Sequence, residues 1–215
     1  MLKVWGRRSA FNVQKVLWLV GELGLPHQHI PAGGDHGGLD DPDFLAMNPH
    51  GRVPVIDDDG VVVWESHAIL RYLAARHGGP AWWPEAAADR AEADGWMDWA
   101  QTSLQRDFLS GVFWSWYRTP PERRDNQAIE IALAACARHF RLLDRVLTDR
   151  PFLGGDALGL ADIPAGAHLY RYFELEIDRP ATPNVEAWYA RLYERRAYQE
   201  AIMVPFGEMK GRLAY

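Results

Sequence analysis

The chain has 215 residues, of which 48% are hydrophobic and 24% are charged. This balance is typical of a globular protein of one large or two small domains, and it argues against disorder. The formal net charge is −6 and no basic run offsets it, so no nucleic-acid partner is expected. No N-terminal signal and no long apolar run is found, and the single cysteine excludes an intramolecular disulfide. We therefore expect a soluble, cytoplasmic protein without a membrane span.

The N-terminal third shows a β-α-β pattern. Residues 1–5 read as a short strand, and residues 11–23 as an amphipathic helix with four apolar residues on one face. Residues 28–30 are a plausible second strand. A hairpin and a helix follow at residues 53–77, and this order of elements predicts a thioredoxin-like α/β domain.

The junction between the first strand and the first helix reads Ser9-Ala10-Phe11-Asn12. A reactive Cys-x-x-Cys motif would occupy this place in a redox-active thioredoxin-like fold. Both cysteines are missing, which excludes a dithiol mechanism by the protein alone. Ser9 and Asn12 could instead donate a hydrogen bond to a thiolate on a bound ligand, close to a helix N-terminus. The alternative is that Ser9 is only the helix N-cap and Asn12 only a polar residue of the first turn.

The following segment, residues 31–41, is a glycine-rich loop without a phosphate-loop signature. It leads to the stretch Asn48–Ser66. Here Val53-Pro54 opens a strand, an unusual position because proline has no N–H for the ladder. A cis peptide bond, which proline makes accessible, would turn the N–H and C=O of Val53 outward. An extended peptide could then pair with Val53 as an added strand.

A hairpin and a helix start complete this stretch. Asp57-Asp58-Asp59-Gly60 predicts a tight turn, and residues 61–64 a β-branched strand. Ser66 occupies the expected N-cap position of the next helix, where free N–H groups favour an anion. Glu65 offers a carboxylate to an amine beside that anion. Together with Val53, these residues predict a receptor for a short zwitterionic peptide.

The rest of the chain predicts a second, all-α domain. The domain boundaries are expected at residues 1–78, with a linker at 79–85 and the helical domain at 86–215. Helical patterns cover residues about 86–110, 122–148, 160–174 and 184–195.

Aromatic residues are concentrated in the second domain. Trp96 and Trp99 lie at helical spacing, which favours a core or a subunit interface. The segment 111–121 is expected to interrupt the helical run and ends in Pro-Pro. Its aromatic residues are therefore the candidates for the wall of an apolar substrate pocket: Phe113, Trp114, Trp116 and Tyr117.

The Asn-Pro-x-Gly-x-Val-Pro motif, followed by a hairpin and Glu-Ser, resembles the glutathione-binding half of the glutathione S-transferase superfamily. The order of segments along the whole chain is similar too, although only the N-terminal third carries specific motifs. The resemblance implies a thioredoxin-like domain followed by a helical domain, glutathione as co-substrate without a metal, and a homodimer. The run Leu160-Ala161-Asp162-Ile163 resembles the N-capping box of the family, which makes Asp162 a structural residue.

The resemblance also implies roles for individual residues. Ser9 or Asn12 would activate the thiol, while Val53-Pro54, Glu65 and Ser66 would bind glutathione. Several transferase classes place a basic residue just before a Pro-x-Phe segment, where it reaches the glycyl carboxylate. Here Pro42-Asp43-Phe44 follows Leu39-Asp40-Asp41, so His36 and Arg52 are the remaining candidates for that contact.

The implied activity is conjugation of the glutathione thiolate to small, electrophilic, hydrophobic substrates. The sequence leaves two alternatives open. One is a glutathione-dependent reductase of disulfides or peroxides, in which two glutathione molecules replace the missing cysteines. The other is a non-catalytic module that binds glutathione, hydrophobic ligands or partner proteins.

Overall fold

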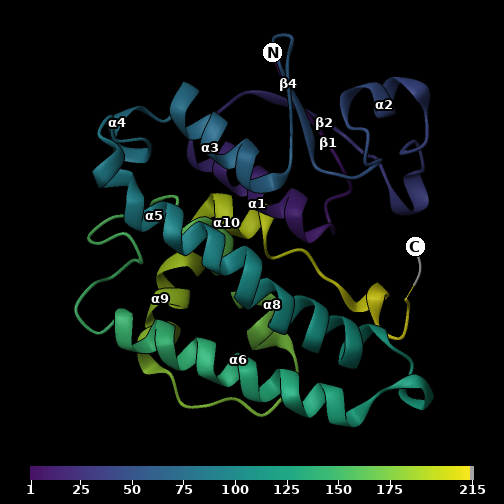
Figure 1. Ribbon diagram of the computed structural model, residues 1–215, viewed down its shortest axis with the longest axis vertical. Coiled ribbons are helices and arrows are strands. Elements are labelled where there is room, and N and C mark those ends of the chain that lie inside the picture. The colour runs from purple at the N-terminus through teal and green to yellow at the C-terminus, as the bar shows by residue number, and fades with distance from the viewer. Residues whose placement is uncertain (214–215) are drawn as a thin grey trace. The chain divides into compact units, whose positions relative to one another are not determined.

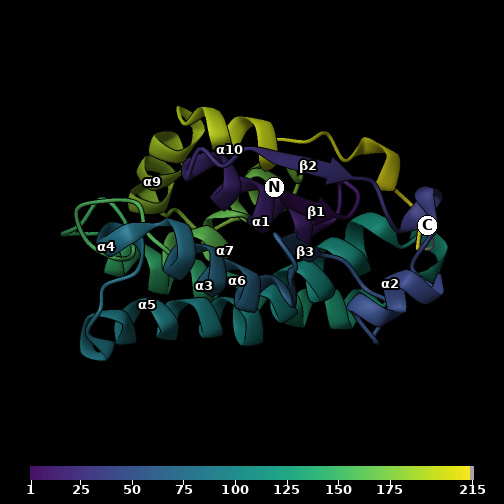
Figure 2. The same cartoon turned by 90° about the horizontal axis from the view of Figure 1, so that it is seen from above.

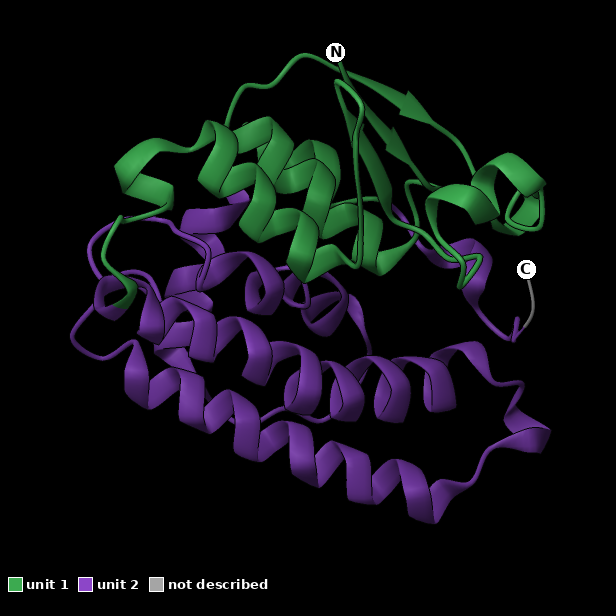
Figure 3. Ribbon diagram, turned by 45° about the horizontal axis from the view of Figure 1, so that its top comes forward, with its two compact units in different colours: residues 1–87, 195–204 green, residues 88–194, 205–215 purple. Residues whose placement is uncertain are grey.

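The computed structural model describes residues 1–213 and divides into two compact units. Unit 1 contains residues 1–87 and also residues 195–204 (Figure 3). Unit 2 contains residues 88–194 and the C-terminal stretch from Pro205. The sequence pattern had placed residues 195–204 with the helical domain, whereas their contacts lie with unit 1.

Unit 1 is built on a four-stranded mixed sheet (Figure 1, Figure 2). Its strands are β1 (Leu2–Trp5), β2 (His27–Ile30), β3 (Val55–Asp58) and β4 (Val61–Trp64), in the order β2-β1-β3-β4. Strand β1 pairs in parallel with β2 and antiparallel with β3, and β3 pairs antiparallel with β4. The sheet and the helices of unit 1 together confirm the predicted thioredoxin-like fold.

The helix α1 (Phe11–Glu22) is the most deeply buried element of unit 1. It packs against α3 (Ser66–His77) and against α10 (Arg196–Ala201). Every residue from Val13 to Val20 is buried, so the prediction of an amphipathic helix is wrong. A helix that is buried on all sides needs cover on each face, and α10, from the far end of the chain, provides part of that cover.

The contact between α1 and α10 is anchored by Glu22. Its carboxylate accepts two hydrogen bonds from the Arg195 guanidinium, at 2.8 and 2.6 Å. It also accepts one from the Trp18 indole N–H at 2.9 Å. Trp18 in turn meets the Tyr198 ring edge-on, with 4.9 Å between centroids. A bidentate arginine–carboxylate pair of this kind fixes the orientation of both partners.

The remaining helices of unit 1 are short. They are α2 (Pro42–Met47), α4 (Gly79–Trp82) and the 3-10 turn η1 (Gly34–His36). The stretch 79–85, expected as a linker, therefore contains one short helix. Helix α5 (Ala87–Trp99) begins at the border between the two units.

In the described residues of unit 2, the regular elements are all helices, and there is one isolated β-bridge. Helix α5 continues into a π-helical stretch, η2 (Ala100–Arg118), and α6 (Asn126–Val146) packs along it. The other elements are η3 (Pro121–Arg123), α7 (Asp162–Gly166), α8 (Leu169–Glu174), α9 (Pro183–Tyr193) and η4 (Gly207–Met209). This confirms the predicted all-α class of the C-terminal domain.

One expectation about unit 2 is wrong. Residues 111–118 do not interrupt the helical run, because η2 continues to Arg118 and ends at Thr119. The N–H of Thr119 donates to the Trp114 carbonyl at 3.0 Å. Pro120 and Pro121 stop the helix because proline has no N–H and restricts the residue before it.

Asp162 is a fully buried structural residue, as the sequence predicted. Its carboxylate accepts hydrogen bonds from the N–H groups of Leu153 at 2.8 Å and Gly159 at 3.1 Å, and from the Trp188 indole at 3.1 Å. Burial raises the pKa of Asp162 to about 7, against the lowering effect of these donors. The carboxylate thus ties the loop before α7 to α9.

Among residues 1–213, no helix combines the length and the apolar character needed to cross a bilayer. The same residues contain no group of three or more histidine, cysteine, aspartate or glutamate side chains placed to hold a metal ion.

Candidate functional site

The loop before β3 is held by the side chain of Asn48, which is 3% exposed. Its amide donates to the Arg52 carbonyl at 2.8 Å, and its Oδ1 accepts from the His50 N–H at 3.1 Å. The Gly51 N–H donates to the Asn48 carbonyl at 3.0 Å. Asn48 therefore fixes the backbone that leads to Val53, a role that was not predicted from the sequence. An asparagine at this position was a signal for such a role, because asparagine side chains often hydrogen-bond the backbone two residues later.

The Val53–Pro54 peptide bond is cis, as predicted. Strand β3 begins at Val55 and not at Val53, because Pro54 has no N–H to give to the ladder. Val53 lies against the loop that follows β1. A Cβ atom on Gly6 would lie 3.2 Å from the Val53 Cβ and 2.3 Å from Val13 Cγ2. Only glycine fits this position, and the close approach brings the loop of Ser9 beside Val53.

Ser9 and Asn12 lie at the start of α1. The helix begins at Phe11 with Ala10 as its N-cap, so the alternative that Ser9 is the cap is wrong. Ser9 is half-buried in the turn before the helix. Asn12 is also half-buried, and its Oδ1 has no hydrogen-bond partner among the described residues. Both polar side chains thus lie beside the positive end of the α1 dipole.

Glu65 has an unusual backbone conformation. The hairpin turns through Asp59 and Gly60, both with positive φ, and β4 leads to Glu65 with φ of 67°. Helix α3 begins at Ser66, so the N-cap is Glu65 and not Ser66 as predicted. Left-handed φ is costly for residues other than glycine, and such strain is concentrated at functional sites. The Glu65 side chain is exposed and makes no capping hydrogen bond.

Ser66 carries an unpaired hydroxyl. It is 1% exposed, and its Oγ has no hydrogen-bond partner among the described residues. Its N–H belongs to the first turn of α3, where backbone donors have no intrahelical acceptor. A buried hydroxyl without a partner costs about 1–3 kcal/mol. A hydroxyl and N–H groups at one helix start, next to an exposed carboxylate, form a seat for a ligand that has both an anion and an amine.

Lys15 lies close to the start of α3 and was not identified as a site residue from the sequence. It is completely buried, and its Nζ lies 3.2 Å from His67 Nε2 on α3. Burial lowers the pKa of Lys15 to about 7, while the Glu65 carboxylate acts in the opposite direction. The available signal was a lysine within the apolar run from Val13 to Val20.

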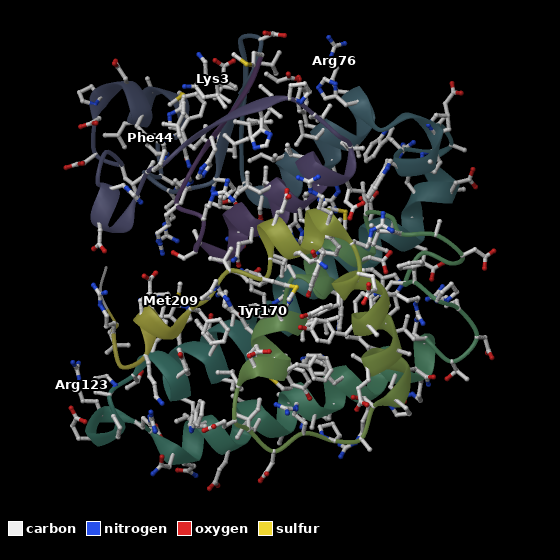
Figure 4. The ribbon with its side chains drawn as sticks, turned by 180° about the vertical axis from the view of Figure 1, so that it is seen from behind. Lys3, Phe44, Arg76, Arg123, Tyr170 and Met209 are labelled. Atoms are coloured by element: carbon white, nitrogen blue, oxygen red, sulfur yellow. The ribbon has the colours of Figure 1, made fainter. Side chains whose placement is uncertain are left out.

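The two candidates for a carboxylate contact lie in different places. Arg52 is exposed and directly precedes Val53. His36 lines a separate cavity of about 670 Å³ with Trp5 and Phe44. Of these three residues, Phe44 is labelled in Figure 4. Neither Val53 nor Ser66 lines that cavity, so the structure does not group His36 with the seat at the start of α3.

The aromatic residues of η2 divide into buried and accessible ones. Phe113 is 1% exposed and stacks on Tyr117, with 5.3 Å between centroids. Both rings contact Phe206, which also meets Tyr170 of α8. This cluster is a core, and it leaves Phe113 little surface for a ligand.

Trp114 is 36% exposed, with the Arg118 guanidinium 3.8 Å from its ring centroid. Trp116 is half-buried beside Arg124. These two rings and Tyr117 are the more accessible members of the predicted set. Trp96 and Trp99 contact each other edge-on, with 5.3 Å between centroids.

The strain at Glu65 generates a prediction about stability. Glu65→Gly and Glu65→Ala remove the same carboxylate, but only glycine adopts positive φ without cost. We expect Glu65→Gly to exceed Glu65→Ala in free energy of unfolding by about 1 kcal/mol. Urea denaturation of the two variants measures this difference. Equal stabilities, or a more stable alanine variant, would contradict the strain assigned to this residue.

Comparisons with known proteins agree with this arrangement. The family model "Glutathione S-transferase, N-terminal domain" matches residues 6–81, and "Glutathione S-transferase, C-terminal domain" matches residues 105–196. The chain is 42% identical to Glutathione S-transferase GstB of Escherichia coli strain K12, across 95% of this chain and 99% of the relative.

A solved structure of similar sequence supports the same assignment. It is the theta class glutathione S-transferase from the citrus canker pathogen Xanthomonas axonopodis pv. citri, with glutathione bound. It superposes with a TM-score of 0.88 at 42% identity, covering 95% of this chain and 98% of the other. From its motifs, its fold and these relatives, the chain belongs to the glutathione S-transferase family.

Proposed function

We propose that this protein is an enzyme that transfers the thiol of glutathione to an electrophilic carbon of a small hydrophobic substrate. The observation that carries the proposal is the start of α3, where the unpaired Ser66 hydroxyl lies next to the strained, exposed Glu65. The relative from Xanthomonas axonopodis pv. citri, with glutathione bound, supports the choice of ligand.

Glutathione would bind as an extended strand along Val53. In this arrangement the cysteinyl backbone pairs with the N–H and C=O of Val53. The carboxylate of the γ-glutamyl end accepts hydrogen bonds from the Ser66 hydroxyl and N–H, and its ammonium pairs with Glu65. For the glycyl carboxylate we favour Arg52 over His36, because Arg52 directly precedes Val53 and His36 lines a separate cavity.

The chemistry begins with loss of the thiol proton to solvent. The Ser9 hydroxyl then donates a hydrogen bond to the thiolate, with the positive end of α1 beside it. A free thiol has a pKa of about 8.5, and a lowering of one to two units corresponds to about 1.4–2.7 kcal/mol. The thiolate attacks the electrophilic carbon, a carbon–sulfur bond forms, and the leaving group departs with its electron pair.

The electrophile would contact the accessible aromatic residues of η2. We assign this role to Trp114, Trp116 and Tyr117, with Phe113 supporting them from the core. Residues 1–78 would form the glutathione-binding domain and residues 86–215 the domain that holds the substrate. Residues 79–85 would link these two domains. The reaction suits the detoxification of electrophiles in the cytoplasm, where a single buried thiol such as Cys136 stays reduced.

We also propose a homodimer. Strand β4 is an edge of the sheet, and three of its large apolar residues are at least 36% exposed: Val61, Val62 and Trp64. An exposed apolar edge strand is a pairing surface unless it is covered. We expect sedimentation equilibrium at micromolar concentration to give twice the chain mass of 24.4 kDa. Val62→Lys should shift the protein towards monomer, and a wild-type monomer would refute the proposal.

Ser66→Ala should weaken glutathione binding without destabilising the fold. Removal of an unpaired buried hydroxyl leaves the free energy of unfolding unchanged or raises it by up to about 1 kcal/mol. Loss of a hydrogen bond to the ligand carboxylate weakens glutathione binding by about tenfold or more. Calorimetric titration and urea denaturation measure the two effects. Ser110→Ala, at an exposed position of η2, is the matched control, and unchanged affinity in Ser66→Ala would move the carboxylate elsewhere.

The identity of the activating residue can be tested by the pH at which bound glutathione ionises. We expect Ser9→Ala to raise that pKa and to lower turnover of a chloronitroaromatic substrate at neutral pH by about tenfold per unit, while glutathione still binds. Thiolate absorbance and steady-state kinetics are the readouts. If only Asn12→Ala has this effect, the amide is the activating group and the assignment to Ser9 is wrong.

The same assay separates the proposed activity from its alternatives. A transferase turns over the chloronitroaromatic substrate, whereas a reductase turns over a small mixed disulfide with glutathione. Glutathione binding without either activity would identify a binding module.

A further inference from the structure

Lys15 is a fully buried lysine close to the proposed glutathione site. Lysine is almost never fully buried unless it is paired, and Lys15 is 0% exposed. Its Nζ lies 3.2 Å from His67 Nε2 and 5.1 Å from the centroid of the Phe11 ring. An ionisable group in such a place is costly to maintain, and such groups are concentrated at functional sites.

The contact between Lys15 and His67 joins two helix starts. Lys15 lies one turn after Phe11 and Asn12 on α1, and His67 directly follows Glu65 and Ser66 on α3. The Glu65 carboxylate acts electrostatically on Lys15 and favours its charged form. The carboxylate that favours a charged Lys15 is thus the one that the proposed function assigns to the ligand amine.

We propose that Lys15 is a positioning residue of the glutathione site, whose ammonium competes with the ammonium of glutathione for the Glu65 carboxylate. The inference rests on the proposed function, because it takes Glu65 as the partner of the γ-glutamyl amine. Glutathione should bind more tightly when Lys15 is neutral, and by linkage its binding should release a proton from Lys15. Since burial lowers the pKa of Lys15 to about 7, this competition falls in the neutral range.

Several other charged groups on or next to elements near α1 form ion pairs or hydrogen bonds of their own. Arg195, which directly precedes α10, pairs with Glu22 at the far end of α1, and Arg196 of α10 pairs with Glu200. On the sheet, Lys3 lies 3.7 Å from Asp57. Asp58 accepts hydrogen bonds from Tyr72 and His77 of α3. His67 is a titratable group in direct contact with Lys15, so the test must separate these two residues.

The experiment measures the affinity of S-methylglutathione by calorimetry between pH 6 and pH 8. Methylation of the sulfur removes the ionisation of the ligand thiol. For the wild type we expect affinity to rise about fivefold over this range, if binding lowers the Lys15 pKa by one unit. The sign follows from the competition, because Lys15 loses its charge as the pH rises.

Two substitutions of Lys15 give opposite predictions. Lys15→Met should bind at every pH as tightly as the wild type does at pH 8. Lys15→Arg keeps a permanent charge and should bind at every pH as weakly as the wild type does at pH 6. His67→Gln keeps a neutral hydrogen-bonding group and should retain the pH dependence. If His67→Gln abolishes it and Lys15→Met does not, the titrating group is His67 and the inference is wrong.

A measurement on the wild type alone keeps the inference testable if the Lys15 variants do not fold. Calorimetry at pH 7 in two buffers of different ionisation enthalpy counts the protons exchanged on binding. Release of a fraction of one proton supports the inference, and no release overturns it. Glu65→Ala identifies failure of the proposed function itself. If that variant binds S-methylglutathione as the wild type does, the amine site is not at Glu65.

Discussion

The burial of α1 is the constraint on which the candidate site depends. Because the residues from Val13 to Val20 are all buried, the helix cannot rotate or slide without disturbing the core on every side. Its first turn is thereby fixed, and with it the positions of Ser9 and Asn12. The same helix holds Gly6 against Val53 through Val13. One packed element thus sets the distance between the proposed thiol donor and the proposed peptide-binding strand.

Asp162 differs from Ser66 and Asn12 in how its buried polar atoms are satisfied. In unit 2, the carboxylate of Asp162 has three donors, and every one of them belongs to the protein. In unit 1, Ser66 Oγ and Asn12 Oδ1 are buried without a partner among the described residues. A satisfied network indicates a structural role, whereas an unsatisfied group is a cost that a ligand can relieve. By this criterion Asp162 is structural, while Ser66 and Asn12 are available to a ligand.

The sequence predicted those features that local chemistry determines. Val-Pro gave the cis bond, Asp59-Gly60 gave the two-residue turn, and the absent cysteines excluded a dithiol mechanism. The sequence did not predict features that depend on contacts between distant segments. The far face of α1 is buried because α10 covers it, more than a hundred residues later in the chain. The burial of Lys15 beside His67 likewise depends on how α1 meets α3.

The predicted ends of helices were the other source of error, and each of these errors had a local cause. The sequence placed the helix cap at Ser66, but the chain reaches α3 through a left-handed residue at Glu65. The segment 111–121, which ends in Pro-Pro, was expected to interrupt the helix, but the π-helical hydrogen bonding of η2 continues up to the prolines. Neither the sign of one φ angle nor a change of helix type leaves a clear signal in composition or periodicity.

The pairing of Glu22 with Arg195 has a consequence for how the protein is made. The two residues are 173 positions apart, yet both belong to unit 1. When the first 87 residues have left the ribosome, the apolar surface of α1 that α10 will cover has no partner. Unit 1 therefore completes its core only after nearly the whole chain has been synthesised. During translation that surface stays uncovered, and a chain that stops before residue 195 has an incomplete core in unit 1.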